Sequence, residues 1–266
     1  MTLPFARTSF PEMYEEGLVE PLFRPWVDML LDNVAFRPED RVLDVACGTG
    51  IVARIAKQRG GPTGRIVGID VNAGMLGVAR SKDESIDWRE GDATALPLRD
   101  GEQFDVVVCQ QGLQFFPDRP AAAREFRRAL APRGRLGVSV WRSDDEIPFG
   151  RELRHVAERH LGPIVDRRHH FGDPAALEAV LRDAGFREIR TRPVSRTIRF
   201  ADGATFVRLN TMALVGMSSG AKALSEDERA RLTAAIIGDS AGVLDRYTAS
   251  NELLFDISTN IAIATA

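Results

Sequence analysis

The sequence predicts an α/β fold built on a doubly wound, largely parallel sheet. Short apolar segments typical of buried strands alternate with helical segments between Val42 and Trp141. The first of these strands runs directly into a Gly-x-Gly turn, which is typical of the junction between a strand and a helix in such sheets. Strands that alternate with helices at these lengths form parallel βαβ units with right-handed crossovers. The 266 residues suffice for one such domain with insertions.

The first strand, Val42–Val45, carries an acid inside an apolar run. A buried carboxyl group is costly unless it is bonded, so Asp44 is predicted to belong to a ligand site. Glycine tolerates positive φ and has no Cβ, so a ligand can approach the main chain at Gly48 and Gly50. The helix from Ile51 adds free N–H groups and the positive end of its dipole. The turn also fits the loose pattern of dinucleotide binders, so the glycines alone leave the ligand open.

The next three strands each lead into residues suited to a nucleoside. Arg65–Asp70 ends in an acid about 20 residues beyond the glycines, where a carboxylate can accept both ribose hydroxyls. Ile86–Glu90 leads into a Gly-Asp-Ala turn at 91–93, whose acid can bond to the amino group of an adenine. Phe104–Cys109 is the fourth strand, and Gln110 follows it.

Helices and strands on both sides of this region complete the predicted sheet. The N-terminal residues Glu12 to Val34 have apolar side chains near helical spacing. The later elements, in order, are a helix over Asp118–Leu130 that closes at Pro132–Gly134, a fifth strand Arg135–Trp141, a helix Pro174–Ala184, a long sixth strand Phe186–Phe200 and a last strand Leu253–Ala264.

Two segments interrupt the alternation, and we expect them to build the acceptor pocket of a single domain spanning 1–266. The first, 142–185, is charged and broken by prolines and glycines, and the second, 201–247, is largely helical. Both flank strand ends, where ligands bind in open α/β sheets. The domain would then comprise N-terminal helices (1–39), a cofactor-binding half (40–141) and these two insertions. An apolar wall is expected from Phe206, Leu209, Met212, Leu214, Val215 and Met217 of the second insertion.

Four features occur together and in a fixed order: Asp44 before the glycines, Asp70, the 91–93 turn and the Phe104–Val107 strand. This set resembles the class I S-adenosylmethionine-dependent methyltransferases, in particular the small-molecule branch with the ubiquinone and menaquinone biosynthesis enzymes. The motif match covers roughly residues 40 to 141. The resemblance implies a Rossmann-like sheet of seven strands with an antiparallel last strand, helical insertions near the acceptor site, S-adenosylmethionine as cofactor and no metal.

The resemblance also implies a role for each matching residue. Asp44, Gly48 and Gly50 would surround the amino and carboxylate groups of the methionine, with Ala46 in the same loop. Asp70 would hold the ribose hydroxyls. The remaining contacts implied are Val71 and Met75 on the adenine face, Asp92 and Ala93 at the adenine edge, and Gln110 beside the sulfonium.

No catalytic residue follows from the sequence with the same force. Many proteins of the resembled family carry one or two histidines after strand four, whereas this chain has Gln111, Gln114 and Phe115 there. Methyl transfer is an in-line displacement whose barrier falls through alignment and exclusion of water. A base is needed only where the acceptor must lose a proton, and His169 and His170 are the candidates. The competing interpretation is a surface histidine pair.

Composition limits the remaining function classes. A net charge of −3 and a pI near 5.9 argue against a nucleic-acid partner. Cys47 and Cys109 stand at the ends of buried strands without metal-ligand spacing, which is typical of reduced thiols in the cytoplasm. No run of about 20 apolar residues predicts a membrane span, and Met1 to Arg7 lacks an apolar stretch long enough to predict a signal peptide. A homodimer is compatible with this composition.

The sequence therefore predicts a cytoplasmic enzyme that transfers a methyl group to a small, partly apolar metabolite. Oxygen, carbon and nitrogen acceptors all stay open, with oxygen or carbon slightly preferred. Three alternatives stay open. The chain could be a cyclase or isomerase that keeps the fold and cofactor, a dinucleotide-dependent oxidoreductase, or a non-catalytic binding module.

Overall fold

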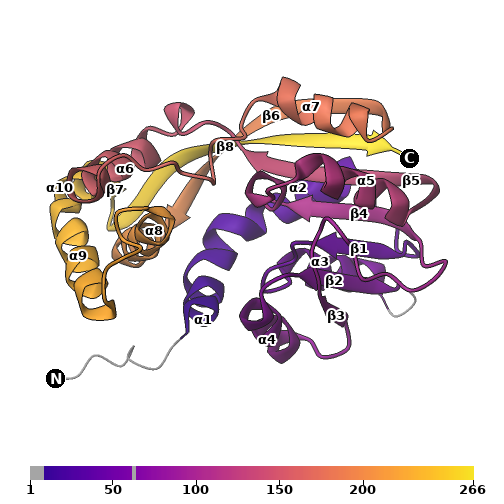
Figure 1. Cartoon of the computed structure of the whole chain (residues 1–266), viewed down its shortest axis with the longest axis horizontal. Helices are drawn as coiled ribbons and strands as arrows, with labels where there is room; N and C mark the ends of the chain where they lie inside the picture. Colours follow the sequence, from indigo (N-terminus) through magenta and orange to yellow (C-terminus); the bar gives the residue numbers. More distant parts are fainter. Residues whose placement is uncertain (1–8, 62–63) are drawn as a thin grey trace.

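The computed structural model describes residues 9–61 and 64–266 (Figure 1). The sequence prediction for Met1 to Arg7 therefore lies outside the described residues. The elements are, in order, α1 Phe10–Tyr14, the π-helix η1 Glu15–Phe23, α2 Arg24–Asn33, β1 Val42–Val45, α3 Ile51–Gly60, β2 Ile66–Asp70, α4 Ala73–Lys82, β3 Asp87–Glu90, β4 Phe104–Gln110, the 3-10 helix η2 Leu113–Phe115, α5 Arg119–Ala129, β5 Leu130–Trp141, the 3-10 helix η3 Asp144–Glu146, α6 Pro148–Leu161, α7 Pro174–Asp183, β6 Arg187–Phe200, α8 Gly203–Met217, α9 Glu226–Asp239, α10 Ala241–Tyr247, β7 Thr248–Ala249 and β8 Glu252–Thr265.

The sheet has the order β3-β2-β1-β4-β5-β8-β6, and the pairs from β3 to β5 are parallel. β8 runs antiparallel to both of its neighbours, β5 and β6. The predicted fold class, with its antiparallel last strand, is confirmed. The two-residue strand β7, which pairs with β8, is an addition that the sequence pattern did not indicate.

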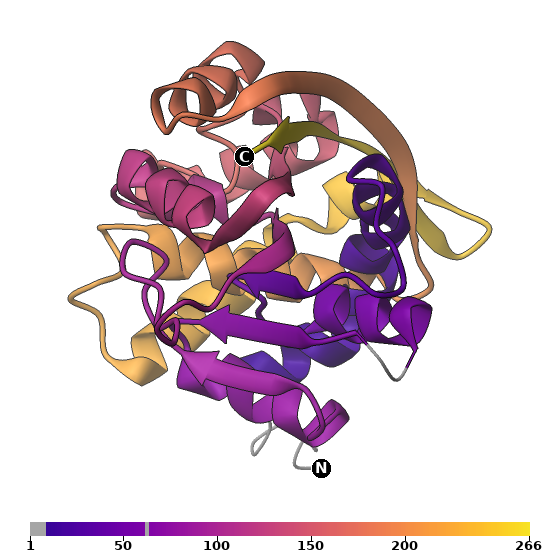
Figure 2. The ribbon, with the colours of Figure 1, turned by 90° about the vertical axis from the view of Figure 1, so that its right-hand side faces the viewer.

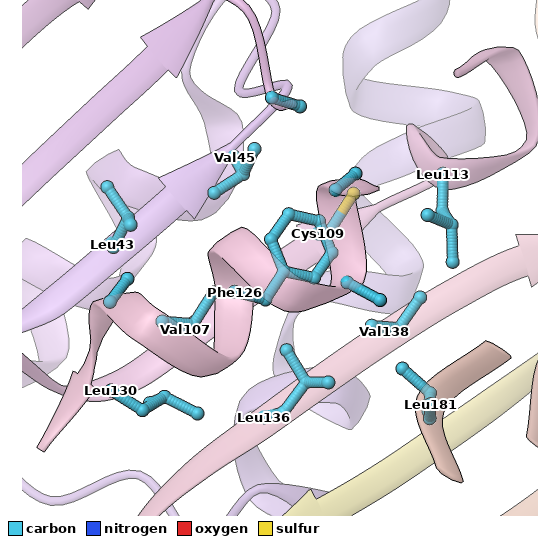
Figure 3. Close-up of a cluster of buried hydrophobic side chains, with 14 of the residues drawn as sticks. Leu43, Val45, Val107, Cys109, Leu113, Phe126, Leu130, Leu136, Val138 and Leu181 are labelled. Atoms are coloured by element: carbon cyan, nitrogen blue, oxygen red, sulfur yellow. The ribbon is translucent and has the colours of Figure 1, made fainter. Parts of the chain in front are cut away.

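Helices cover both faces of the sheet. On one face, α2, α3 and α4 pack through Leu30, Val52 and Leu76. On the other face, α5 and α7 pack through Phe126 and Leu181, and Figure 3 shows Phe126 among side chains of the strands. Burying apolar side chains on both faces fits the continuous apolar runs of the parallel strands. This packing fixes the carboxyl ends of β1, β2, β4 and β5 along one edge.

The fifth strand begins earlier than the sequence pattern predicts. Helix α5 ends at Ala129, and Leu130 already pairs with Phe104 of β4. The register then shifts before Val106 pairs with Arg135, and Arg133 has a left-handed φ of 64°. The Pro-Arg-Gly segment at 132–134 is therefore an irregularity inside a strand, where a helix stop was expected.

β6 and β8 extend beyond β5 and carry a second layer of helices. The last pair of β5 with β8 is Trp141–Thr259, whereas β6 and β8 stay paired as far as Phe200 and Leu253. Figure 1 shows α6, α8, α9 and α10 gathered at this projecting end, and Figure 2 shows the strong curvature of β6. These helices and the projecting strands share one apolar cluster that includes Phe149 and Phe255. We call α6, α8, α9 and α10 the cap.

The predicted first insertion, 142–185, divides between the two layers. Its helix α6 belongs to the cap, with Phe149 and Leu153 in the apolar cluster there. Its helix α7 instead packs on the sheet through Leu177 and Leu181. The segment 174–185 is thus a crossover of the sheet, because its apolar face is covered by strands rather than by the cap.

Candidate active site

A cavity of about 780 Å³ opens where the carboxyl ends of the strands meet the cap. From the sheet it is lined by the last residue of each of four strands, Val45 of β1, Asp70 of β2, Gln110 of β4 and Trp141 of β5. The cap lines its other side, mainly through α6 and α8. Ligands of open α/β sheets bind outside the carboxyl ends of strands, so the cavity has the expected position.

The two glycines after β1 have different surroundings. Gly48 lines the cavity at a φ of +56°, and a Cβ built there would meet no atom within 4 Å. Gly50 has a φ of +87° and does not line the cavity, and a Cβ there would lie 2.3 Å from the ring of Trp88. Only Gly48 therefore offers main chain to a ligand. The structure differs here from the prediction for Gly50, whose missing side chain makes room for Trp88.

Asp44 is buried in β1 with only 1% of its surface exposed, and it lines the cavity. Its Oδ2 accepts a hydrogen bond of 3.1 Å from the backbone N–H of Ala53, in the first turn of α3. Burial raises the pKa of Asp44 to about 8, the Ala53 N–H opposes this rise, and the charge of Asp70 adds to it. Because burial makes the ionised form of Asp44 unfavourable, a bound cation would stabilise that form, and the site is suited to one.

Asp70 stands at the end of β2 and joins three parts of the site. Its Oδ2 accepts from the backbone N–H of Gly48 at 2.8 Å, and its Oδ1 accepts from that of Asn72 at 2.8 Å. Asn72 in turn caps α4 by accepting from Gly74 and Met75. Burial raises the pKa of Asp70, against these hydrogen bonds. Each oxygen keeps a second lone pair that a ligand hydroxyl can use.

The residues predicted to surround the adenine all lie in the cavity wall. They are Val71, Met75, Asp92 and Ala93, although Val71 is otherwise largely exposed. Asp92 accepts hydrogen bonds from the backbone N–H and the hydroxyl of Thr94, both at 2.8 Å, and they lower its pKa. Asp92 is therefore ionised at neutral pH and acts only as an acceptor there.

Several buried polar atoms in the cavity wall have no hydrogen-bond partner within the described part of the chain. They include Oγ1 of Thr49, Oε1 of Gln110 and Oε1 of Gln111. Gln110 donates through Nε2 to the Phe23 carbonyl at 3.2 Å. Buried polar groups normally find partners, so these atoms mark a place for a ligand with donors of its own. Together with Gly48 and Ala46, both at positive φ in the wall, these polar groups fit S-adenosylmethionine, whose amino group and ribose hydroxyls donate hydrogen bonds.

The cap end of the cavity is apolar. Phe206, Leu209 and Met217 of α8 line it as predicted, whereas Leu214 and Val215 are buried in the cluster behind. The other apolar residues at this end are Leu18, Leu22, Ile147, Phe149, Ala213, Phe255 and Ile257. Tyr14, Phe115 and Phe116 also line the cavity, while Trp26 is fully buried against Trp141 and does not.

The adjacent histidines separate in the structure. His169 lines the cavity, and its Nδ1 lies 3.0 Å from the carbonyl oxygen of Arg142. His170 is exposed, and its Nε2 lies 2.8 Å from Nη2 of Arg119. Its Nδ1 lies 2.9 Å from the carbonyl oxygen of Arg167. The interpretation as a surface pair is right for His170 only.

Two polar residues that line the cavity near the cap were not predicted from the sequence. Arg168 and Asn210 both line the cavity, and the Arg168 Nη1 donates to Asn210 Oδ1 at 2.8 Å. A signal was present for Asn210, because it is an amide inside the apolar run of α8, just as Asp44 is an acid inside β1. Arg168 gave no such signal, since it stands in a charged segment.

Known proteins resemble this chain in sequence. A methyltransferase domain family matches residues 43–138. The nocamycin O-methyltransferase of Saccharothrix syringae is 34% identical over 201 residues, which are 67% of this chain and 70% of that protein. The chain belongs to the class I S-adenosylmethionine-dependent methyltransferases. The demethylmenaquinone methyltransferase of Thermus thermophilus is likewise 34% identical over 179 residues, which are 60% of this chain and 80% of that protein.

The methyltransferase fold extends over nearly the whole chain. The solved structure of the cyclase SpnF superposes with a TM-score of 0.54 and 23% identity, covering 91% of this chain and 80% of SpnF. That likeness concerns the fold alone, whereas the sequence relatives named above are methyltransferases. This enzyme thus uses S-adenosylmethionine to methylate a small molecule. Within 9–61 and 64–266, no helix has the length and apolar character needed to cross a bilayer.

Proposed function

We propose that this methyltransferase holds S-adenosylmethionine along the strand ends and a small, partly apolar acceptor under the cap. The observation that carries the proposal is that one cavity is lined by Asp44, Gly48 and Asp70 at one end and by α8 at the other. When bound, the cofactor supplies an electrophilic methyl carbon on a sulfonium. The residues of this chain bind and align the two reactants.

The cofactor contacts follow from the charges and hydrogen bonds of the wall. Asp44 receives the methionine amino group, because a cation offsets the cost of its buried charge. Gly48, with Ala46 beside it, presents main chain to the methionine end, while Gly50 supports this loop from behind through its contact with Trp88. Asp70 accepts the ribose hydroxyls with its remaining lone pairs.

The adenine and sulfonium contacts complete the assignment. Val71 and Met75 cover the adenine face, and Asp92 with Ala93 reads its edge. Gln110 lies beside the sulfonium, where its unpartnered Oε1 faces positive charge favourably. Apolar walls around this point exclude water, and alignment in a closed cavity lowers the barrier of a displacement.

The acceptor is proposed to be a partly apolar small molecule, with oxygen or carbon as the methylated atom. Apolar side chains make up nearly all of the cap wall, so burying an apolar body there is favourable. The names of the two sequence relatives, an O-methyltransferase and a menaquinone-pathway enzyme, agree with such acceptors.

The cellular setting extends the same proposal. We propose a cytoplasmic enzyme without a nucleic-acid partner, active alone or as a homodimer. Both cysteines are free and buried, and burial raises the pKa of each thiol, as expected of reduced thiols that serve as core residues. The net charge of −3 supports a small-molecule substrate over a polyanion.

Calorimetric titration of the full chain with S-adenosylmethionine, S-adenosylhomocysteine and NAD tests the cofactor assignment. We expect the first two to bind and NAD not to bind. Asp70→Ala should weaken binding by about 1 to 3 kcal/mol, as for lost charge-assisted bonds. Asp173→Ala is the matched control, because Asp173 also accepts a backbone N–H, that of Ala175, but does not line the cavity. Unchanged affinity in Asp70→Ala would refute the ribose role.

A further inference from the structure

The hydrogen bond of His169 to the main chain leaves one of its ring nitrogens unprotonated. Its Nδ1 lies 3.0 Å from the Arg142 carbonyl oxygen, which can only accept, so Nδ1 carries the proton. Nε2 is then the acceptor nitrogen of a neutral imidazole. It has no hydrogen-bond partner among residues 9–61 and 64–266, and the side chain lines the cavity.

The segment that carries His169 is held from several sides. Asp166 accepts from Arg168 through both carboxylate oxygens, at 2.6 to 3.1 Å, and Arg168 reaches Asn210 of α8. The backbone N–H of His169 donates to the Asp166 carbonyl at 3.1 Å. Asp166 and Asn210 are both buried. A ring fixed in this way can meet a bound molecule at a defined position.

A second anchor ties the segment to the sheet. Asn260 of β8 donates to the carbonyl of Gly172 at 2.7 Å and accepts from Arg142 at 2.8 Å. Arg142 therefore joins β8 through its side chain and His169 through its carbonyl oxygen. The imidazole is thus oriented by β8, whose Asn260 pairs with Val140 next to the cavity-lining Trp141.

The charged groups around His169 act in both directions. Burial lowers its pKa most, and the Arg168 guanidinium lowers it further. The carboxylates of Asp166 and Asp144 oppose this, as does the hydrogen bond to Arg142. The pKa stays below its usual value, so the imidazole is neutral at pH 7 and able to take a proton.

We propose that His169 is the general base of the reaction, and that the acceptor carries a phenolic or enolic hydroxyl on an apolar body. This inference rests on the proposed function. The hydroxyl proton passes to Nε2 as the oxygen forms a bond to the methyl carbon and the C–S bond breaks, its electron pair returning to sulfur. Phenols have pKa values near 10 and gain from a base at neutral pH, whereas a neutral amine attacks without one.

Methyl transfer to defined probes tests this assignment. The full chain is supplied with S-adenosylmethionine labelled at the methyl carbon and with 2-naphthol, 4-hydroxycoumarin or 2-naphthylamine. We expect oxygen-linked methyl on at least one of the two hydroxyl probes, identified by mass spectrometry and NMR. His169→Asn can keep the hydrogen bond to Arg142 but lacks Nε2, so kcat should fall about 10²- to 10⁴-fold with KM nearly unchanged. His170→Asn is the matched control and should keep the wild-type rate.

The pH profile separates a base from a positioning role. At saturating cofactor, the wild-type kcat should decline on the acid side with a pKa below the usual 6.5 of histidine. His169→Asn and His169→Gln should both lack this limb. If the folded His169→Asn and His169→Gln proteins keep the acid-side decline of kcat, or keep the wild-type kcat, His169 is not the general base.

The remaining outcomes separate this proposal from the cofactor assignment. Transfer to 2-naphthylamine alone overturns the hydroxyl class. Transfer to neither hydroxyl probe, in a protein that binds S-adenosylmethionine, also overturns it while the cofactor assignment stands. Failure to bind S-adenosylmethionine refutes the proposed function itself.

Discussion

The carboxylate of Asp70 accepts a hydrogen bond of 2.8 Å from the backbone N–H of Gly48. It links the end of β2 to the glycine turn after β1, across 22 residues of chain. The other Asp70 oxygen holds the N–H of Asn72, which caps α4. The turn, the ribose carboxylate and the first turn of α4 are therefore coupled, and a change in one is expected to reach the others.

Alanine substitutions at Gly48 and Gly50 are expected to fail in different ways. Both positions have positive φ, which costs an alanine about 1 to 2 kcal/mol. Gly48→Ala adds a methyl group in open space at the cavity wall, so we expect weaker binding of S-adenosylmethionine. Its free energy of unfolding should fall only by the cost of the positive φ. Gly50→Ala forces a methyl group against Trp88, so its free energy of unfolding should fall by more than about 3 kcal/mol. Calorimetry and chemical denaturation measure the two effects.

Gly101→Ala is the control for strain alone. Gly101 has a φ of +69° with nothing within 4 Å of a built Cβ, and it lies outside the cavity. Its variant should lose as much stability as Gly48→Ala and bind the cofactor normally. Equal cofactor affinity in Gly48→Ala and Gly101→Ala would contradict the role of the Gly48 main chain.

Replacing Asp44 by asparagine is expected to stabilise the ligand-free protein at alkaline pH. The pKa of Asp44 is about 8 in the fold, against about 3.9 in an unfolded chain, so the native state binds the extra proton between these values. Stability therefore falls as pH rises from 4 to 8, by up to about 1.4 kcal/mol per unit. The asparagine side chain does not ionise and can still accept from Ala53. The Tm advantage of Asp44→Asn should grow between pH 5 and pH 8 and level off above; a constant difference would argue against a buried ionisation.

Cofactor affinity should depend on pH through the same carboxyl group. A bound ammonium favours the ionised form of Asp44, so binding releases a proton below pH 8. We expect affinity for S-adenosylmethionine to fall by up to about tenfold per unit between pH 7.5 and pH 6. Calorimetry in two buffers of different ionisation enthalpy measures the released proton. Asp92→Asn should keep this dependence, because the lowered pKa leaves Asp92 ionised throughout, whereas Asp44→Asn should lose it.

Filling the cap end should separate acceptor binding from cofactor binding. Leu209→Trp adds bulk to the apolar wall of α8, so we expect methyl transfer to fall at least tenfold while the affinity for S-adenosylhomocysteine changes by less than about threefold. Gly216→Trp places the same ring on an exposed position of α8 with open space around it. This control should keep both properties. Loss of cofactor affinity in Leu209→Trp would place the cofactor, instead of the acceptor, under the cap.

Local pattern was enough to predict the sheet and much of the cofactor side. The apolar runs of β1, β2 and β4 and their acids are visible in the sequence, because strand burial and strand-end chemistry depend on neighbouring residues. β5 was placed too late since its first residues gain their partner, Phe104, from another strand. Without knowledge of the pairing between Leu130 and Phe104, the Pro-Arg-Gly segment at 132–134 predicts the end of a helix.

The sequence by itself determined the fold class, S-adenosylmethionine as the cofactor, and the location of Asp44 and Asp70 on the first two strands. Only the tertiary structure decided that the missing side chain of Gly50 leaves room for the Trp88 ring, and that Trp26 is a core residue. It likewise decided that His169 lines the cavity while His170 lies against Arg119. These distinctions depend on contacts between distant segments, such as Arg142 with His169 and Asn260 with Gly172. Periodicity tells which residues are buried on an element, whereas the packing of β6, β8 and the cap decides which of them face a ligand.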